Sequence, residues 1–85
     1  MDELESLPNI GRMMAQQLRQ AGIETPEQLR KAGSREVWLR IQGFDSSACY
    51  NRLCALEGAV QGIRWHGLSE EDKRELKDFY REHRL

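Results

Sequence analysis

Apolar residues recur along this chain at the spacing of helices. Leu53, Leu56 and Val60 follow one another at three and four residues, which places them on one face of a helix. No stretch alternates apolar and polar residues as a half-buried strand does. The pattern predicts an all-α fold, a compact bundle of about five helices. The positions that we expect to be buried are Leu18, Ile23, Leu29, Val37, Ile41, Leu53, Leu56 and Val60.

Residues that begin and end helices divide this pattern into segments. Thr25 is a natural N-cap and Pro26 suits the first helical position. Asp45 or Ser46 should begin the longest helix, and Trp38 should lie on the flank of the helix before it. The helices are expected at about 2–6, 11–20, 25–32, 34–42, 45–61 and from 69 onward.

Residues 7–11, Leu-Pro-Asn-Ile-Gly, predict a tight turn between the first two helices. Pro8 fixes its own φ and keeps the preceding residue out of helical geometry. Gly11 can adopt a φ that other residues avoid, so we expect Gly11→Val to destabilise the fold. The N–H groups after the turn open a helix N-terminus that could face an anion such as phosphate.

Chain length and net charge limit the classes of function that this protein can have. Eighty-five residues allow one domain, 1–85, with a small core. The net charge of −1 lacks the basic footprint of a dedicated nucleic-acid-binding protein. Charge is uneven, however, because residues 6–23 contain Arg12 and Arg19 and no acid. This face is therefore either a phosphate contact or an ordinary solvated helix surface.

No set of residues predicts catalysis, a metal site or a cofactor. Cys49 and Cys54 lie in an apolar pattern and are interpreted as small buried residues. His66 and His83 stand apart, without further ligands at zinc spacing. Glu57 has no partner carboxylate for acid–base chemistry. We therefore expect a non-enzymatic protein.

Three residues near the end of the 45–61 helix have structural interpretations. Glu57 is expected to pair with Arg52 or Arg64. Gly58 should permit close helix packing, and Trp65 should fill a gap in the core beneath the last helix.

The sequence also bears on location. The acidic N-terminus lacks the basic and apolar regions of a signal peptide. No run approaches the ~18 apolar residues of a membrane helix. We expect a cytoplasmic protein without membrane contact.

The turn resembles the helix-hairpin-helix motif of DNA repair and replication proteins, with Asn9 in place of the first hairpin glycine. Two further motifs extend a second resemblance over about residues 4–76. One is Leu-Cys-Ala-Leu-Glu-Gly-Ala from Leu53 to Ala59, and the other is Trp-His-Gly-Leu from Trp65 to Leu68. With the turn, they resemble the C-terminal domain of TfoX (Sxy) competence regulators.

The TfoX resemblance implies a regulatory role with other transcription factors. Members usually carry an N-terminal domain as well. In contrast, we expect this chain to be a stand-alone domain without it. Two functions stay open. The domain either contacts duplex DNA weakly and non-specifically through the hairpin, or binds a regulatory protein while the hairpin is purely structural. The expected DNA-contacting residues are Asn9, Gly11, Arg12, Gln16 and Arg19.

Overall fold

The computed structural model describes residues 3–84, and every regular element among them is a helix. The all-α prediction, with five α-helices, is confirmed. In chain order the elements are η1 (Leu4–Ser6), α1 (Arg12–Gln20), α2 (Pro26–Ala32), α3 (Ser34–Gln42), α4 (Tyr50–Gln61), η2 (Trp65–Gly67) and α5 (Glu70–His83), where η denotes a 3₁₀ turn.

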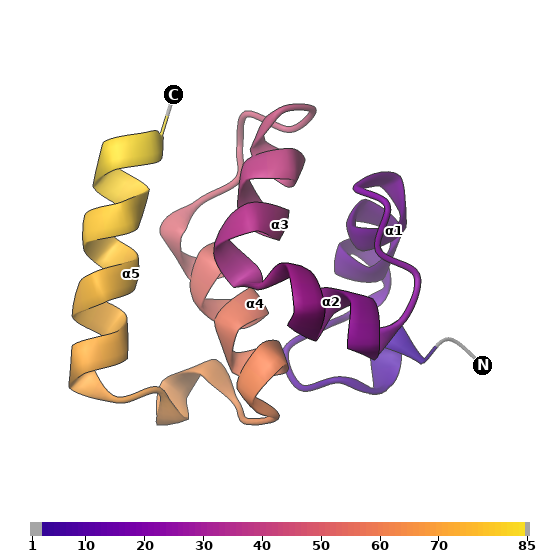
Figure 1. The fold of residues 1–85 in the computed structure, drawn as a ribbon, viewed down its shortest axis with the longest axis horizontal. Coiled ribbons are helices and arrows are strands. Elements are labelled where there is room, and N and C mark those ends of the chain that lie inside the picture. Colours follow the sequence, from indigo (N-terminus) through magenta and orange to yellow (C-terminus); the bar gives the residue numbers. More distant parts are fainter. Residues whose placement is uncertain (1–2, 85) are drawn as a thin grey trace.

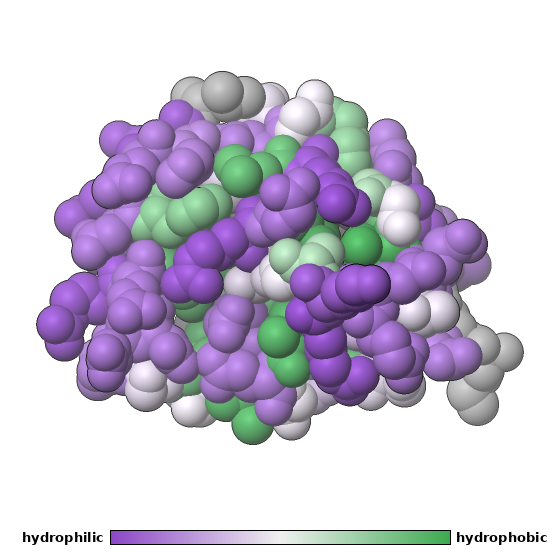
Figure 2. All heavy atoms as spheres, viewed as in Figure 1, coloured by the Kyte–Doolittle hydropathy of each residue, from purple (hydrophilic) through white to green (hydrophobic). Residues whose placement is uncertain are grey.

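The helices are arranged around α3 and α4, which pack against each other in the middle of the molecule (Figure 1). Helix α5 packs on α4 at one end of the longest axis, and α1 lies toward the other end. On the face shown in Figure 2, hydrophilic residues predominate and hydrophobic residues show only in separate small areas. Among residues 3–84, no helix has the length and apolar character needed to cross a membrane.

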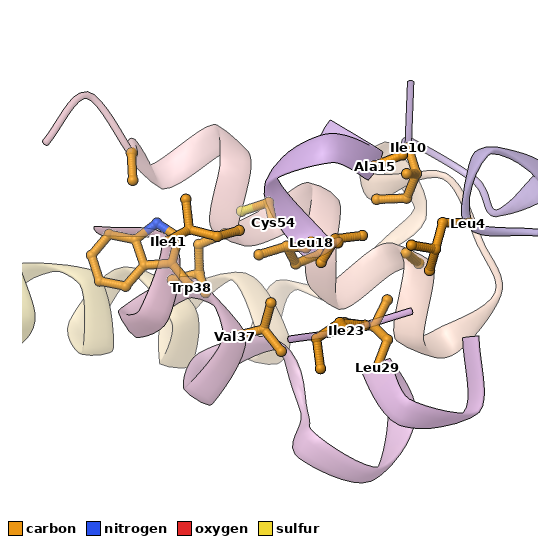
Figure 3. Close-up of a cluster of buried hydrophobic side chains, with 14 of the residues drawn as sticks. Leu4, Ile10, Ala15, Leu18, Ile23, Leu29, Val37, Trp38, Ile41 and Cys54 are labelled. Carbon is orange, nitrogen blue, oxygen red and sulfur yellow. The ribbon is translucent and has the colours of Figure 1, made fainter. Parts of the chain in front are cut away.

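The core is one cluster of apolar side chains drawn from all five helices, η1 and the turn after it (Figure 3). Every position that the helical spacing predicted is buried, except Val60, which is half-buried. Trp38 was expected on a flank but is completely buried. Its ring meets Phe79 and Tyr80 of α5 edge to face, at 6.1 and 5.7 Å between centroids. These contacts, far apart in sequence, are what a local pattern could not show.

Helix ends follow their sequence signals in α1 and α2. Gly22 has φ +89°, and the Ile23 N–H donates to Leu18 O at 2.8 Å, which completes a Schellman cap. Ile23 and Leu18 are both buried, so the cap also brings an apolar pair into the core. The Thr25 hydroxyl accepts from the Gln28 N–H at 3.2 Å, as predicted for the start of α2.

Two helix boundaries differ from the prediction. The first helix is only the 3₁₀ turn η1, and the Asp2 part of that prediction lies outside the described residues. Helix α4 begins at Tyr50, not at Asp45 or Ser46, so the 14 residues of α5 make it longer than the 12 of α4. Asp45 is responsible, because its carboxylate accepts from the backbone N–H and the hydroxyl of Ser47 and holds this segment as a loop.

Candidate functional site: the hairpin and the first turn of α1

The turn before α1 is built on Asn9 rather than on glycine. The Ile10 N–H donates to Leu7 O at 3.3 Å, with Pro8 and Asn9 between them. Asn9 has φ +70°, the left-handed region that this position of a type II turn requires. Ile10 is buried and fixes the turn to the core.

The Asn9 side chain holds the turn against a segment more than 45 residues away. Its amide nitrogen donates to Ala55 O at 3.3 Å and to Ile63 O at 3.0 Å. Its oxygen accepts from the Trp65 N–H at 3.1 Å. Asn9 was predicted as a DNA contact, and this stays a prediction; the structure places its side chain against α4 and η2. Its role there is to position the turn.

Gly58 makes room for this arrangement. A Cβ on Gly58 would lie 2.5 Å from the Asn9 amide nitrogen and 2.8 Å from Ile63 O. Gly58 was predicted to permit close packing of helices, and the structure shows a close approach of a different kind. The neighbours are the Asn9 side chain and the chain leading into η2, not another helix.

Gly11 does not have the conformation that we expected of it. Its φ of −95° and ψ of −172° are extended backbone that any residue adopts. A Cβ on Gly11 would meet no atom within 4 Å. The expectation that Gly11 is required for the turn was wrong, because Asn9 already supplies the left-handed residue.

The start of α1 is open to solvent. Gly11 is the N-cap and provides no capping side chain, and the first turn contains no acid. The N–H groups of this turn therefore keep the positive end of the helix dipole uncovered. Arg12, Gln16 and Arg19 lie at i, i+4 and i+7, on one exposed stripe of α1. We call Gly11, Arg12, Gln16 and Arg19 the hairpin surface.

A shallow hollow of about 260 Å³ adjoins this surface. Asp45 lies at its side, where its carboxylate accepts from Gln17 Nε2 at 2.6 Å and Arg52 Nη1 at 2.9 Å. Hydrogen bonds from Ser47, together with those from Gln17 and Arg52, hold the pKa of Asp45 well below its usual value. The residues that line the hollow are Gly11, Met13, Met14, Gln17 and Arg52.

This cluster around Asp45 joins α1 to α4, and we had predicted Asp45 only as a helix cap. The Asp-Ser-Ser sequence at 45–47 was a signal for the local turn, since aspartate commonly accepts from the N–H two residues on. No local signal identified Gln17 and Arg52 as its partners.

The remaining predicted residues do not form a site together. Glu57 accepts from Ser34 Oγ at 2.6 Å and from Gln61 Nε2 at 2.7 Å, so the predicted arginine partners were wrong. Trp65 is half-buried, packs against the core and lies against the ring of His66, 3.9 Å between centroids.

The two cysteines differ. Both are free, but Cys54 is buried and Cys49, contrary to prediction, is exposed. Cys49 is the N-cap of α4 and so lies outside the helix whose apolar face it was expected to share. Within residues 3–84, no group of three or more His, Cys, Asp or Glu side chains is placed to hold a metal ion.

Among residues 3–84 the chain is an all-α domain whose hairpin is fixed to α4 and η2. The family model of the TfoX C-terminal domain matches residues 1–80, so the chain belongs to that family. Among curated proteins, it is 31% identical over 78 residues to protein Sxy of Escherichia coli (strain K12). That alignment covers 92% of this chain and only 37% of Sxy, so the chain spans little more than a third of its relative.

Solved structures show the same fold. A triclinic crystal structure of an uncharacterized protein from Listeria monocytogenes is 57% identical, with a TM-score of 0.92. The match covers 93% of this chain and 90% of the Listeria chain. A tetragonal crystal structure of a protein of unknown function from the same organism is also 57% identical, with a TM-score of 0.90. This match also covers 93% of this chain, and it covers 98% of the second Listeria chain.

Proposed function

We propose that this domain is a non-enzymatic regulatory module that contacts the DNA backbone, without sequence preference, through the hairpin surface. The TfoX family membership supports a role in competence or transcription regulation. The resemblance of the turn to a helix-hairpin-helix motif supports DNA as the ligand. The hairpin surface would then contribute a phosphate contact to a larger regulatory assembly.

The observation that carries this proposal is the uncovered N-terminus of α1 beside Arg12. This end of the helix has no capping side chain and no acid in its first turn, and Gly11 and Arg12 are exposed. Backbone N–H groups and the helix dipole together favour a phosphate at such a position. Gln16 and Arg19 continue the polar stripe along α1 and can follow the backbone from there.

The expected strength is modest. A surface of this size contacts about two or three phosphates, so log affinity should fall with log salt at a slope of about −2 to −3. The dissociation constant should lie in or above the non-specific range of about 10⁻⁴–10⁻⁶ M. Contacts of this kind carry no base information, so unrelated duplexes should bind alike.

Fluorescence anisotropy with unrelated duplexes at several salt concentrations tests the proposal. Arg12→Glu should weaken binding to every duplex and make the salt slope about one unit shallower. Arg30→Glu on α2 is the matched control, since it makes the same charge change at another exposed site. Absence of binding at low salt, or equal losses for the two variants, would remove the hairpin surface as a DNA contact.

One observation favours the alternative, a protein partner with a purely structural hairpin. Met13 is 72% exposed at the edge of the 260 Å³ hollow. Exposed methionine is common at adaptable protein-binding surfaces. A photo-crosslinking residue at Met13 that captures one defined protein in cells, with no duplex binding in vitro, would support this function instead.

A further inference from the structure

Most of the charged residues of α5 are sorted by sign around the helix. Successive residues of a helix are ~100° apart around its axis. Over the last three turns of α5, one arc about 100° wide contains only cations. We call this arc the basic face of α5; its members are Lys73, Arg74, Lys77 and Arg81. Four of the six acids of the same helix lie on a neighbouring arc, which we call the acidic face; its members are Glu71, Glu75, Asp78 and Glu82. Glu70 and Asp72, in the first turn, lie outside it.

Contacts on either side of α5 show where the two faces point. Glu75 of the acidic face lies 3.9 Å from Arg35 of α3. On the other side, the Tyr50 hydroxyl of α4 donates to Lys73 O at 3.0 Å. The basic face therefore borders the first turn of α4 and the acidic face borders α3. The two faces adjoin on the solvent side of α5, where Arg74 and Asp78 are about one helical turn apart.

The basic face is largely open. Arg74, Lys77 and Arg81 are exposed. A hollow of about 320 Å³ lies between the helix and Tyr50. Glu70 is the acid on this side; its carboxylate is 3.9 Å from Lys73 Nζ, and its side chain is 90% exposed. The residues that line the hollow are Tyr50, Glu70, Lys73, Arg74 and Lys77.

We propose that the basic face of α5 is a second surface for the phosphate backbone of duplex DNA. From Lys73 to Arg81 it extends roughly 12 Å at ~1.5 Å per residue. That length matches about three to four nucleotides of one strand at ~3.4 Å each. Helix α5 and helix α1 lie toward opposite ends of the longest axis (Figure 1), so this surface meets a different stretch of DNA from the hairpin surface.

The residues of α5 also argue against a membrane, a protein or a single-stranded nucleic acid as the ligand of this face. A membrane-bound helix inserts its apolar face, but Leu76 of α5 is buried and Phe79 and Tyr80 pack against the core. Protein interfaces rely on exposed aromatic or methionine anchors, and the exposed large hydrophobic residues of 3–84 lie outside α5. Single strands need aromatic rings for stacking, but Tyr50 is half-buried with its hydroxyl engaged. A duplex backbone needs only the cations.

Site-resolved NMR distinguishes this surface from the hairpin surface. Amide spectra of the ¹⁵N-labelled chain are recorded while a 12-base-pair duplex is added at low salt. We expect shifts along 73–81 that persist in Arg12→Glu and disappear in the double variant Lys77→Glu, Arg81→Glu. Each phosphate contact contributes about 0.9 to the slope of log affinity against log salt. Losing one contact should therefore weaken binding at this face about eightfold in 0.1 M salt. Arg30→Glu is the matched charge reversal outside both surfaces and should leave the 73–81 shifts in place.

Each result decides between the two surfaces. Shifts confined to the hairpin surface would overturn the α5 proposal and leave the proposed function standing. Shifts confined to α5 would support the α5 proposal and overturn the hairpin surface as a DNA contact. Equal loss of the α5 shifts in Arg30→Glu would show that only net charge matters and would also overturn it. The same would follow if phosphatidylserine vesicles, added in place of the duplex, produced the α5 shifts and the duplex did not.

Discussion

The side-chain amide of Asn9 fills the space that a Cβ would occupy on Gly58. The amide nitrogen would be 2.5 Å from that atom, and the two residues come from opposite halves of the chain. Asn9 also spans α4 and η2 through hydrogen bonds to Ala55, Ile63 and Trp65. The orientation of the hairpin therefore depends on a polar side chain that reaches the backbone only because position 58 has no side chain.

Gly58→Ala should destabilise the fold. The added methyl must displace the Asn9 amide and the backbone at Ile63, and overpacking of this kind costs about 1–3 kcal/mol. Urea denaturation gives the free energy of unfolding. Gly11→Ser is the control: it supplies an N-cap hydroxyl at an unstrained position and should change stability by only a few tenths of a kcal/mol. Equal stability of Gly58→Ala and the unaltered chain would contradict this close approach.

Two substitutions at Asn9 should separate its backbone role from its side-chain role. Asn9→Gly keeps the positive φ but loses three hydrogen bonds, which should cost about 1–3 kcal/mol. Asn9→Ala should cost a further ~1 kcal/mol, because alanine is strained in the left-handed region. Thermal and urea melts of both variants give the order. If Asn9→Ala were the more stable of the two, the turn would not have the geometry described.

Helical periodicity predicted most of the core because burial is a local property of a helix face. Leu18, Leu29 and Leu56 each belong to a stripe whose spacing alone places them inside. Thr25 was equally predictable, because an N-cap depends on neighbouring residues. The same local arguments gave the number of α-helices approximately, since the first of the six expected segments is the 3₁₀ turn η1.

Contacts between distant segments could not be predicted in this way. Nothing near Asn9 indicates that its amide reaches Ile63, and nothing near Asp45 indicates Arg52. Trp38 follows the same rule, since its burial depends on the aromatic rings of α5. For the hairpin surface, the sequence predicted the exposed stripe. It did not show the protein contacts of the Asn9 side chain, however, because those partners lie more than 45 residues away.

Leu56→Ala should be among the most damaging changes in the core. The side chain is completely buried, so its truncation should cost about 2–5 kcal/mol, from lost burial and the cavity left behind. Val60→Ala on the same helix should cost less, because Val60 is half-buried. Urea denaturation of both variants measures the difference. Equal losses would contradict the observed distinction between these two positions.

The two cysteines should differ in reactivity in the native protein. Cys49 is exposed, whereas Cys54 is buried, and burial raises the pKa of the Cys54 thiol. The thiolate is the reactive form, so iodoacetamide at pH 8 should modify Cys49 and leave Cys54 intact until the chain is unfolded in urea. Mass spectrometry of proteolytic peptides identifies the modified residue. Equal labelling of both cysteines without urea would show that the α4 core opens readily.

Asp45 should make stability depend on pH in the acid range. Hydrogen bonds from Ser47, Gln17 and Arg52 lower its pKa in the folded state, so the unfolded chain takes up a proton at a higher pH than the folded chain does. The stabilisation is therefore complete above the unfolded value of about 3.9 and is lost as the pH falls below it. Asp45→Asn cannot form the ion pair with Arg52.

The measurement is the urea midpoint at pH 7 and at pH 3. The decrease between them should be smaller in Asp45→Asn than in the unaltered chain, while Asp78→Asn, at an exposed position of α5, should keep the full decrease. An identical decrease in all three proteins would contradict the assignment of this carboxylate as the link between α1 and α4.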